Sequence, residues 1–460
     1  MAPGFVEVPA SHGYWLRSGR VPVALLAEAA GLTPDGDGLA LADIEVLGSV
    51  VGRITPAGAA QAGAPGVSLD GGQVWPCFVD LHTHLDKGHI WPRAQNPDGT
   101  FGGALSAVAA DRRARWSSDD VRRRMEFGLR CSWAHGTRAV RTHIDSHGPQ
   151  GAISWPVVQT LRREWAGRVE LQAVSLAPLD AYDGRDGDRL ANLVASAGGI
   201  LGGVVFMTPS IENQLDRMLG LAADRGLDVD VHADESGDPG ARALGHIARA
   251  VLRRGFGGRV VCGHCCSLAV QPPEVVDETL DLVKQAGIAV VTLPMCNLYL
   301  QDRVPGRTPR WRGVTLLHEM KARGIPVAVA SDNVRDPFYG FGDHDMLEVY
   351  REATRIVHLD RPYADWPRAV TTTAADLMGL PAAGRLGSGL PADLLLFRAR
   401  HYSELLARPQ VDRVVIRNGR AIDTTLPDHR ELDDLMREGA PPMSARAKRP
   451  DRPTDQSRGH

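Results

Sequence analysis

Short hydrophobic runs alternate with amphipathic helical stretches along the central part of the chain. The runs are rich in β-branched residues, and this alternation is typical of βα units that build a parallel sheet. Eight such units predict an α/β fold of the (β/α)8 TIM-barrel type, whose active sites lie at the carboxyl ends of the strands. The eight runs are 74–81, 139–145, 169–177, 201–207, 228–231, 259–262, 289–293 and 326–330.

One of the helical stretches carries clear start and stop signals. Ser117 opens the sequence SSDD in the manner of a capping box, and Gly136 stands where a helix would end. Between them, apolar residues recur at helical spacing and therefore share one helix face. These residues are Val121, Met125, Leu129 and Trp133.

The two ends of the chain show a different pattern, with short strand-like segments separated by Gly and Pro turns. These segments lie within 39–74, 392–397 and 411–423. We expect both ends to combine into one small β-sandwich domain. Beyond it the chain is charged and rich in proline, which predicts a mobile tail. The predicted domains are 1–73 and 383–426 for the two parts of the β-sandwich, 74–382 for the barrel and 427–460 for the tail.

Composition narrows the class of protein. With 460 residues, of which 43% are hydrophobic, the chain can bury a large core. The net charge is −3, and the arginine runs at 112–115 and 122–124 lie among acidic residues, which predicts solvated helix faces and no nucleic-acid partner. The six cysteines follow no regular spacing and are expected to be reduced thiols. Without an apolar run of membrane-spanning length or a signal-peptide pattern, we expect a cytoplasmic protein with no membrane partner.

Several predicted strands end in an imidazole or a carboxylate. His82 and His84 end the first run, His232 the fifth, His264 the sixth and Asp332 the eighth. Residues two apart on a strand point to the same face, so His82 and His84 can reach one ion. Three neutral imidazoles and a carboxylate suit a divalent ion such as Zn²⁺ or Fe²⁺, which lowers the pKa of bound water. The sequence therefore predicts a metal site above the carboxyl ends of the strands, held by His82, His84, His232 and Asp332.

The positions of the lysines indicate how many metal ions this site holds. A two-metal variant of such barrels needs a carboxylated lysine on the fourth strand, which the sequence places at 201–207. The chain has only Lys87, Lys284, Lys321 and Lys448, and none of them lies in that run. We therefore expect one ion per chain.

Ordered motifs give the chain a resemblance to a known family. The segments are FVDLHTHLDK, GTRAVRTHID, VDVHADE, VCGHCCS, PMCNLYLQDR, SDNVRDPF and GLPADLLLF. Together they resemble the amidohydrolase superfamily, and within it the cytosine deaminase-like branch. The resemblance implies hydrolytic deamination of a small nitrogen heterocycle. It also implies the same four metal ligands, a proton shuttle at Glu235 and a partner for the attacking water at His264.

Hydrolytic deamination needs a nucleophile at an amidine-like carbon, a proton on the adjacent ring nitrogen and a proton on the departing ammonia. Glu235 follows the ligand His232 by three residues and is placed to carry both protons. His264 is expected to orient the water, and Asp332 to accept a proton as the intermediate collapses. The alternatives are that Glu235 is a surface acid and that His264 is a buried structural imidazole.

Four further residues are candidates for substrate contacts, each with a structural alternative. His143 ends the second run and either touches substrate or donates a hydrogen bond to another site residue. Lys87 either binds a substrate oxygen or pairs with Asp86. Asn297 and Gln301 follow the seventh run, where side-chain amides either recognise a ring edge or cap the loop.

Two departures from the cytosine deaminase pattern bear on the substrate. Relatives specific for cytosine carry a glutamine after the third strand, whereas residues 175–179 read SLAPL and end at Leu179. Those relatives also have a second aspartate after the metal-binding one, where this chain has Asn333. Leu179 and Asn333 are therefore also candidates for substrate contacts. We therefore expect that cytosine is not the best substrate, and that the apolar loop leaves room for a substituted aminopyrimidine, a triazine or a pterin-like ring.

Other functions remain open from the sequence. The same site could hydrolyse another C–N bond, in a cyclic amide or an N-alkylated ring amine, although Glu235 favours an amidine substrate. A non-catalytic barrel is a second alternative, which the complete set of site residues disfavours. A homo-oligomer is also compatible with the sequence, which does not set the number of subunits.

Overall fold

The computed structural model describes residues 4–28 and 30–437 and has a mixed α/β fold. Parallel strands form a five-stranded sheet, ordered β13-β12-β11-β10-β9, and a three-stranded sheet, ordered β6-β7-β8. Isolated parallel bridges link the two sheets on both sides, between Val174 and Ile200 and between Thr83 and Asp332. The strands are β6 (Phe78–Thr83), β7 (Thr137–Asp145), β8 (Glu170–Leu176), β9 (Leu201–Val205), β10 (Val229–Ala233), β11 (Val260–His264), β12 (Ala289–Thr292) and β13 (Val327–Val329).

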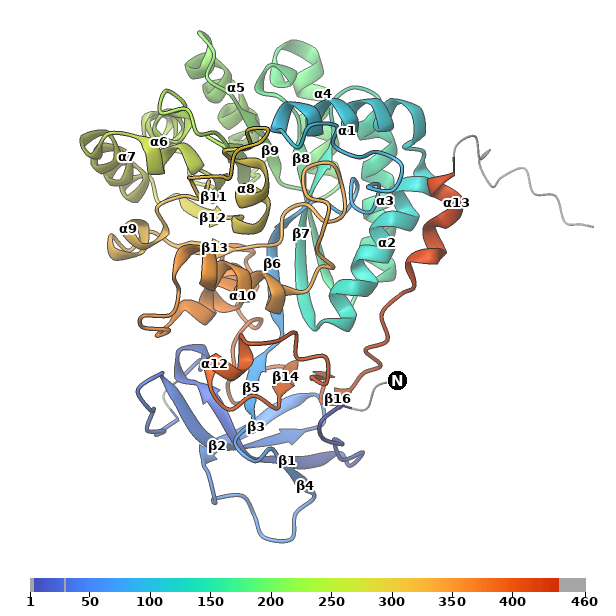
Figure 1. The fold of residues 1–460 in the computed structure, drawn as a ribbon, viewed down its shortest axis with the longest axis vertical. Helices are drawn as coiled ribbons and strands as arrows, with labels where there is room; N and C mark the ends of the chain where they lie inside the picture. The colour runs from blue at the N-terminus through green and yellow to red at the C-terminus, as the bar shows by residue number, and fades with distance from the viewer. Residues whose placement is uncertain (1–3, 29, 438–460) are drawn as a thin grey trace, which may run out of the picture.

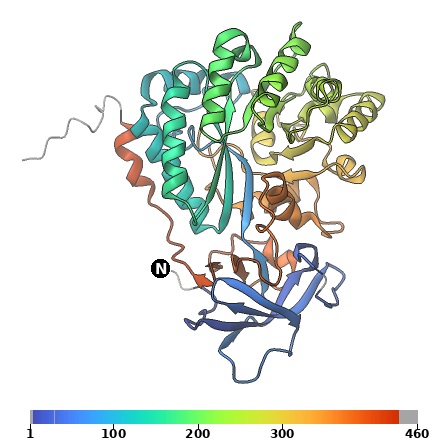
Figure 2. The ribbon, with the colours of Figure 1, turned by 180° about the vertical axis from the view of Figure 1, so that it is seen from behind.

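Helices connect these strands and lie around the outside of them (Figures 1 and 2). The capped helix expected after Ser117 is confirmed as α2, with the Ser117 hydroxyl accepting from the backbone N–H of Asp120. The α-helices are α1 (Phe101–Arg115), α2 (Ser118–Ala134), α3 (Gln150–Glu164), α4 (Gly184–Ser196), α5 (Ile211–Ala223), α6 (Ala243–Arg254), α7 (Pro273–Gln285), α8 (Pro294–Leu300), α9 (Leu317–Ala322), α10 (Met346–Val357), α11 (Thr372–Leu377), α12 (Tyr402–Leu405) and α13 (Asp433–Met436). The 3-10 helices are η1 (Val23–Leu25), η2 (Leu179–Tyr182), η3 (Cys266–Val270), η4 (Trp366–Val370) and η5 (His429–Leu432).

Both chain ends contribute to one further eight-stranded sheet at one end of the molecule (Figure 1). Its order is β16-β15-β14-β5-β1-β2-β3, and β4 pairs with β1. The expected joining of the two ends is therefore present, while the two-layered sandwich stays a prediction. The strands are β1 (Gly13–Pro22), β2 (Leu39–Leu47), β3 (Val50–Pro56), β4 (Gly66–Ser68), β5 (Gln73–Pro76), β14 (Leu394–Phe397), β15 (Val414–Arg417) and β16 (Arg420–Ala421).

Two strand assignments differ from the sequence prediction. The single run at 74–81 is divided, because β5 joins the flanking sheet and β6 begins the series of parallel strands. Every residue in both strands is buried, so no polar alternation marks the change of sheet. β1 was not predicted at all, since a register shift between Leu16 and Gly19 interrupts its alternation.

The segment after residue 427 corrects the prediction of a mobile tail. η5 and α13 pack on α2, where Leu432 joins Phe127 in a small apolar cluster. Arg123 on α2 pairs with Asp434 at 2.7 Å, and a capping box at Asp428 starts η5. The capping box at Asp428 and the burial of Leu432 therefore stabilise helices in a segment whose composition is mostly polar. The rest of the predicted tail, 438–460, lies outside the described residues.

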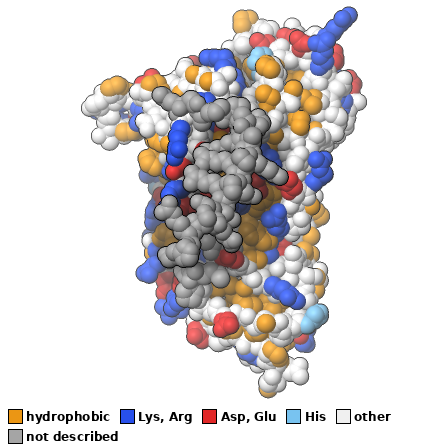
Figure 3. Space-filling view, turned by 90° about the vertical axis from the view of Figure 1, so that its right-hand side faces the viewer, with side chains coloured by type: hydrophobic (Ala, Val, Ile, Leu, Met, Phe, Trp, Pro, Cys, Tyr) orange, Lys and Arg blue, Asp and Glu red, His pale blue; other side chains and the backbone are white. Residues whose placement is uncertain are grey.

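Basic side chains on the helices are less solvated than the sequence suggested. Arg124 is fully buried, donates to the Asp120 carboxylate at 2.6 Å and reaches the backbone carbonyl oxygens of Asp86 and Gly88. Acidic and basic side chains lie interspersed among the described residues on the face drawn in Figure 3. All six cysteines are free and buried. Within residues 4–28 and 30–437, no helix combines the length and apolar character needed to cross a membrane.

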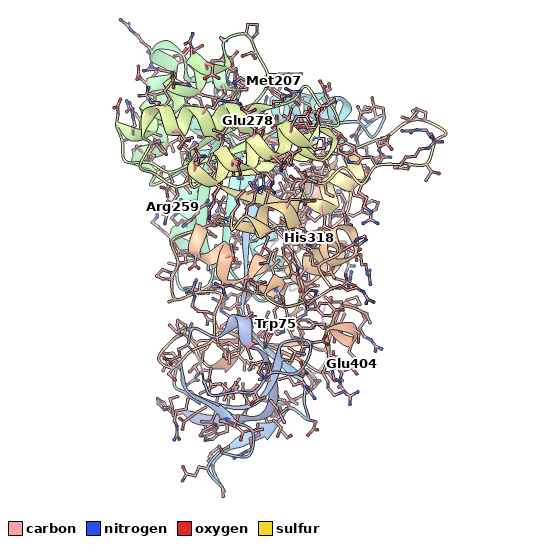
Figure 4. The ribbon with its side chains drawn as sticks, turned by 90° about the vertical axis from the view of Figure 1, so that its left-hand side faces the viewer. Trp75, Met207, Arg259, Glu278, His318 and Glu404 are labelled. Atoms are coloured by element: carbon pink, nitrogen blue, oxygen red, sulfur yellow. The ribbon has the colours of Figure 1, made fainter. Side chains whose placement is uncertain are left out.

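Trp75 joins the flanking sheet to the parallel strands, at the junction seen in Figure 4. Its side chain is fully buried and belongs to β5. Aromatic rings from both parts of the chain surround it, with ring centroids at 5.8 to 6.4 Å. These rings are Phe78, Tyr350, Phe397 and Tyr402.

Trp75→Ala is expected to lower the free energy of unfolding by about 3 to 5 kcal/mol, because it removes a large buried ring and leaves a cavity. Urea unfolding followed by circular dichroism measures the change. Val411→Ala is the control, since Val411 is 82% exposed and should change stability by less than about 0.5 kcal/mol. A similar small change for both variants would show that Trp75 does not stabilise the junction.

Candidate active site

The four predicted metal ligands converge in the structure. His232 Nε2 lies 3.2 Å from both His82 Nε2 and His84 Nε2. Asp332 Oδ1 lies 3.2 Å from His84 Nε2 and 3.7 Å from His82 Nε2. All four side chains are buried. His264 also reaches this group, since its ligand atom and those of His82, His232 and Asp332 all lie within 4.8 Å of one another.

The donor atoms of this cluster fit a divalent cation. Neither carboxylate oxygen of Asp332 has a hydrogen-bond partner among the described residues, although the side chain is fully buried. A buried carboxylate without a partner is strongly unfavourable, and a cation among imidazoles would balance its charge. Nitrogen and carboxylate ligands in this number suit the borderline divalent metals. The cluster can therefore hold a metal ion.

The protonation states agree with metal binding. Burial lowers the pKa of His82 and of His232 well below the usual range, and that of His264 to about 4. These imidazoles are therefore neutral and keep a free nitrogen lone pair near neutral pH. Burial acts to raise the pKa of Asp332, but the neighbouring imidazoles of His84 and His264 together outweigh it, so the pKa is lowered and the carboxylate stays ionised.

Strand ends and short turns hold the cluster in place. His264 at the end of β11 and Asp332 after β13 both have left-handed backbone angles, with φ of 68° and 65°. Such angles are unfavourable for residues other than glycine and are typical of functional sites. Asp80 on β6 accepts from the backbone N–H of Ser331 at 3.1 Å and from its hydroxyl at 2.6 Å. This contact ties the segment that carries Asp332 to the strand that carries His82.

Glu235 and His264 face each other beside the cluster. Glu235 Oε1 lies 3.5 Å from His264 Nδ1. Asn297 on α8 contacts both, with its Nδ2 at 3.3 Å from Glu235 Oε1 and at 3.0 Å from His264 Nδ1. Burial, and then the charge of Asp332, raise the pKa of Glu235 well above its usual range. The Glu235 carboxyl group can therefore hold a proton within reach of the cluster.

The turn that presents Glu235 is fixed by its neighbours. Asp234 has a left-handed backbone with φ of 54°, and its carboxylate accepts from the backbone N–H groups of Ala243 and Leu244 at 2.7 and 2.9 Å. This carboxylate caps the first turn of α6. Gln301 donates to the backbone oxygen of Glu235 at 3.3 Å. Of the two predicted loop amides, Asn297 therefore contacts the acid side chain and Gln301 holds its backbone.

A cavity of about 290 Å³ opens onto the cluster. Helix α1 forms one wall through Phe101, Leu105 and Val108, and residues 176–178 form another. Phe206 lines the cavity while remaining 49% exposed. Its neighbour Met207 lies at the end of the molecule remote from the flanking sheet in Figure 4. The walls are largely apolar and the floor is polar, which is typical of a site for a small ring.

Leu179 lies behind this wall. The sequence placed it among candidate substrate contacts, but it begins η2 and packs in the main hydrophobic core. The preceding residues Leu176, Ala177 and Pro178 line the cavity instead. The reason is the turn into η2, which directs the Leu179 side chain away from the cavity.

Lys87 takes part in an ion-pair chain that the sequence did not predict. Its Nζ donates to Asp145 Oδ1 at 3.0 Å, so its partner is Asp145 and not Asp86. Arg112 on α1 donates to the other oxygen of Asp145 at 2.6 Å. All three side chains line the cavity. Arg112 was expected on a solvated helix face. Its ion pair with Asp145 instead holds α1 against the cavity.

His143 and Asn333 occupy different positions relative to the cavity. The His143 ring packs against that of His82 at a tilt, with centroids 3.9 Å apart and an interplanar angle of 31°. Its Nε2 lies 3.6 Å from Asp230 Oδ1 on β10. His143 therefore supports the metal ligand His82 and does not line the cavity. Asn333 lines the cavity and donates to Asp336 at 2.6 Å. Only Asn333 of this pair is placed to meet a molecule in the cavity.

Comparison with known proteins decides the family. The amidohydrolase family model matches residues 162–424. A pterin deaminase of Rhizobium rhizogenes (strain K84 / ATCC BAA-868) is 53% identical over 437 residues, which cover 95% of this chain and 100% of that protein. The chain belongs to the amidohydrolase family. It is therefore a hydrolase that acts on C–N bonds.

Two further comparisons cover most of this amidohydrolase. The N-isopropylammelide isopropyl amidohydrolase of Pseudomonas sp. (strain ADP) is 26% identical, with 77% of this chain and 87% of that protein covered. A crystal structure of 5-methylcytosine deaminase from Klebsiella pneumoniae, liganded with 5-fluorocytosine, has a TM-score of 0.74 at 25% identity. It covers 91% of this chain and 98% of that one. The resemblance that the motifs indicated is thereby confirmed.

The cavity residues on α1 are those that sequence reasoning missed in this amidohydrolase. Phe101, Leu105, Val108 and Arg112 recur at intervals of three or four and share one face of the helix. This periodicity was available in the sequence. It did not show that the face covers a cavity, because the orientation of α1 depends on the ion pair between Arg112 and Asp145, residues 33 positions apart.

Proposed function

We propose that this amidohydrolase is a metal-dependent hydrolytic deaminase that replaces the amino group of a pterin-like ring by oxygen and releases ammonia. The main support for this proposal is the similarity to a pterin deaminase, which is 53% identical over 95% of this chain and the whole of that protein. The cluster of imidazoles and carboxylates at the bottom of a cavity suited to a small ring supports the same reaction.

The roles of the metal-site residues follow from their positions. His82, His84, His232 and Asp332 would hold one divalent ion, Zn²⁺ or Fe²⁺. When bound, such an ion supplies Lewis-acid activation of the water that attacks the ring. His143 keeps the His82 ring in place by packing against it. The contact between Asp80 and Ser331 keeps Asp332 beside β6.

Proton transfer falls to Glu235. Its Oε1 takes one proton of the attacking water and gives it to the ring nitrogen next to the attacked carbon. As the intermediate collapses, Asp332 accepts the remaining proton of the attacking oxygen, and that proton passes to the leaving amino group, which departs as ammonia. His264 hydrogen-bonds the atoms that develop charge at that carbon. Asn297 positions both side chains, since it contacts each of them. One C–N bond breaks and one C–O bond forms, with water as the second substrate.

The two parallel sheets also suggest how the whole set of strands is arranged. We propose that β6 to β13 close into a (β/α)8 barrel, because parallel bridges join the two sheets at both of their edges. The flanking strands would then form the β-sandwich that both chain ends build. The site lies at the carboxyl ends of the strands, as in other barrels of this kind.

Pterin is expected to exceed cytosine in kcat/KM by at least about tenfold, because the apolar wall at 176–178 offers no amide to pair with the edge of cytosine. Ammonia release from pterin, cytosine, an amino-triazine and an aminopyrimidine measures the preference. A tenfold advantage for cytosine over the other rings would contradict the proposed substrate class.

Hydrolysis of an N-alkylated ring amine is the second candidate function. It is supported by the 26% identity with an N-isopropylammelide isopropyl amidohydrolase. Incubation with N-isopropylammelide and analysis of the released amine separate the two functions. Isopropylamine as the faster product would favour this candidate, whereas ammonia from pterin would favour deamination. A metal-replete protein that releases neither amine from any ring would favour a non-catalytic barrel.

A further inference from the structure

A second group of potential metal ligands lies beside the predicted metal cluster. One ligand atom from each of Glu235, Cys296 and Asp332 lies within 4.8 Å of the other two. Asp332 belongs to both groups, whereas Glu235 and Cys296 belong only to this one. We call these three residues the sulfur subsite.

The sulfur subsite places a buried thiol next to a buried carboxylate that has no hydrogen-bond partner among the described residues. Cys296 on α8 is fully buried, and its sulfur lies 3.8 Å from both Asn333 Oδ1 and the backbone oxygen of Phe338. Neither oxygen of the buried Asp332 carboxylate has a hydrogen-bond partner among the described residues. A buried carboxylate oxygen without a donor, next to a thiol and a second carboxylate, is a position where a cation would lower the free energy.

The chemistry of the three ligands selects the type of cation. Thiolate ligands favour soft or borderline ions such as Zn²⁺ and Cd²⁺ over Mg²⁺ and Ca²⁺. On binding, the metal takes the place of the thiol proton of Cys296 and of the proton held by the Glu235 carboxyl group, and both protons pass to the solvent. Asp332 has two oxygens and can bridge two ions, as carboxylates do in two-metal sites with ions about 3.5 to 4 Å apart. The three negative ligands offset the repulsion between two such ions.

We propose that the sulfur subsite binds a second, inhibitory soft divalent cation when the first metal position is already filled. Because the cation binds the Glu235 carboxylate, it prevents that group from transferring protons. The inhibitory effect rests on the role of Glu235 in the proposed function, whereas the binding itself does not.

Cadmium titration of the metal-replete protein tests the proposal. CdCl₂ is expected to add about one ion per chain beyond the first, with an ultraviolet sulfur-to-cadmium charge-transfer band at the same stoichiometry. Deaminase activity should fall by at least about a hundredfold at saturation, the lower end of what one acid–base group contributes. MgCl₂ at the same concentrations should produce neither effect.

Cys296→Ser is the decisive variant, because it keeps the size of the side chain and replaces the soft ligand by a hard one. It should retain the first metal and the basal activity and should lose the charge-transfer band. The CdCl₂ concentration for half-inhibition should rise at least about tenfold, since even the loss of a group that only supports a ligand has that effect. Cys131→Ala removes another buried thiol, on α2, and should behave like the unmodified protein.

Two results would overturn the proposal. The first is a charge-transfer band of equal strength in the unmodified protein and in Cys296→Ser, or no band in either. The second is a band that depends on Cys296 while activity stays unchanged, which would leave a metal site without inhibition. If the chain proved not to be a deaminase, the band and the ion count would still decide whether the sulfur subsite binds metal.

Discussion

Glu235→Gln is expected to lower kcat by at least about a hundredfold while the protein keeps its metal, because glutamine preserves the shape but cannot transfer a proton. Glu235 Oε1 lies 3.5 Å from His264 Nδ1 and 3.3 Å from Asn297 Nδ2, so the amide can occupy the same position. Steady-state kinetics with pterin and metal analysis of the same sample measure the two effects separately.

Glu278→Gln is the matched control for this prediction. Glu278 lies on α7, its side chain is 64% exposed, and Figure 4 shows it on the outer surface of the molecule. The control should leave kcat and metal content unchanged. Near-normal turnover of Glu235→Gln would refute the proton-transfer role, and loss of its metal would instead make Glu235 a ligand.

His82→Ala should lose metal and activity together. His82 is fully buried, and its Nε2 lies 3.2 Å from His232 Nε2 and 3.7 Å from Asp332 Oδ1. Removing it takes one of four ligands away, so metal affinity should fall by more than about a hundredfold, the upper end for residues that only support a ligand. Mass spectrometry of the metal content and the rate of ammonia release measure the outcome.

His318→Ala provides the comparison for the metal prediction. His318 on α9 contacts the backbone oxygen of Val357 at 2.8 Å and lies outside the cluster. This variant should keep about one ion per chain and its activity. About two ions per chain in the unmodified protein, purified without added metal, would contradict the single-ion proposal.

Much of the architecture could be predicted because it depends on local patterns. Each of the eight hydrophobic runs overlaps one of the strands β6 to β13, and Ser117 and α2 lie where capping and periodicity placed them. His82, His84 and His232 could be proposed as one cluster because carboxyl ends of parallel strands meet at one edge. The structure brings these imidazoles together with Asp332.

The failures concern features that depend on distant partners. Arg124 is buried because backbone oxygens 36 and 38 residues away accept from it, and nothing near it in sequence indicates this. Arg112 meets Asp145 across the cavity for the same reason. The apolar loop at 175–179 suggested that Leu179 contacts substrate, but its side chain packs in the hydrophobic core at the start of η2. Sequence patterns therefore located the reacting groups better than the walls that select a substrate.

The most direct test of the proposed deamination follows the oxygen atom that replaces the amino group. Metal-replete protein is incubated with pterin in water enriched in ¹⁸O, and the product and released ammonia are quantified by mass spectrometry and a colorimetric assay. Hydrolytic deamination at the metal site predicts one ¹⁸O atom in the 2-oxo product for each ammonia released, and both should be lost in His82→Ala. Pterin recovered unchanged from the active-site-intact, metal-replete protein would contradict it, as would a product that lacks the label.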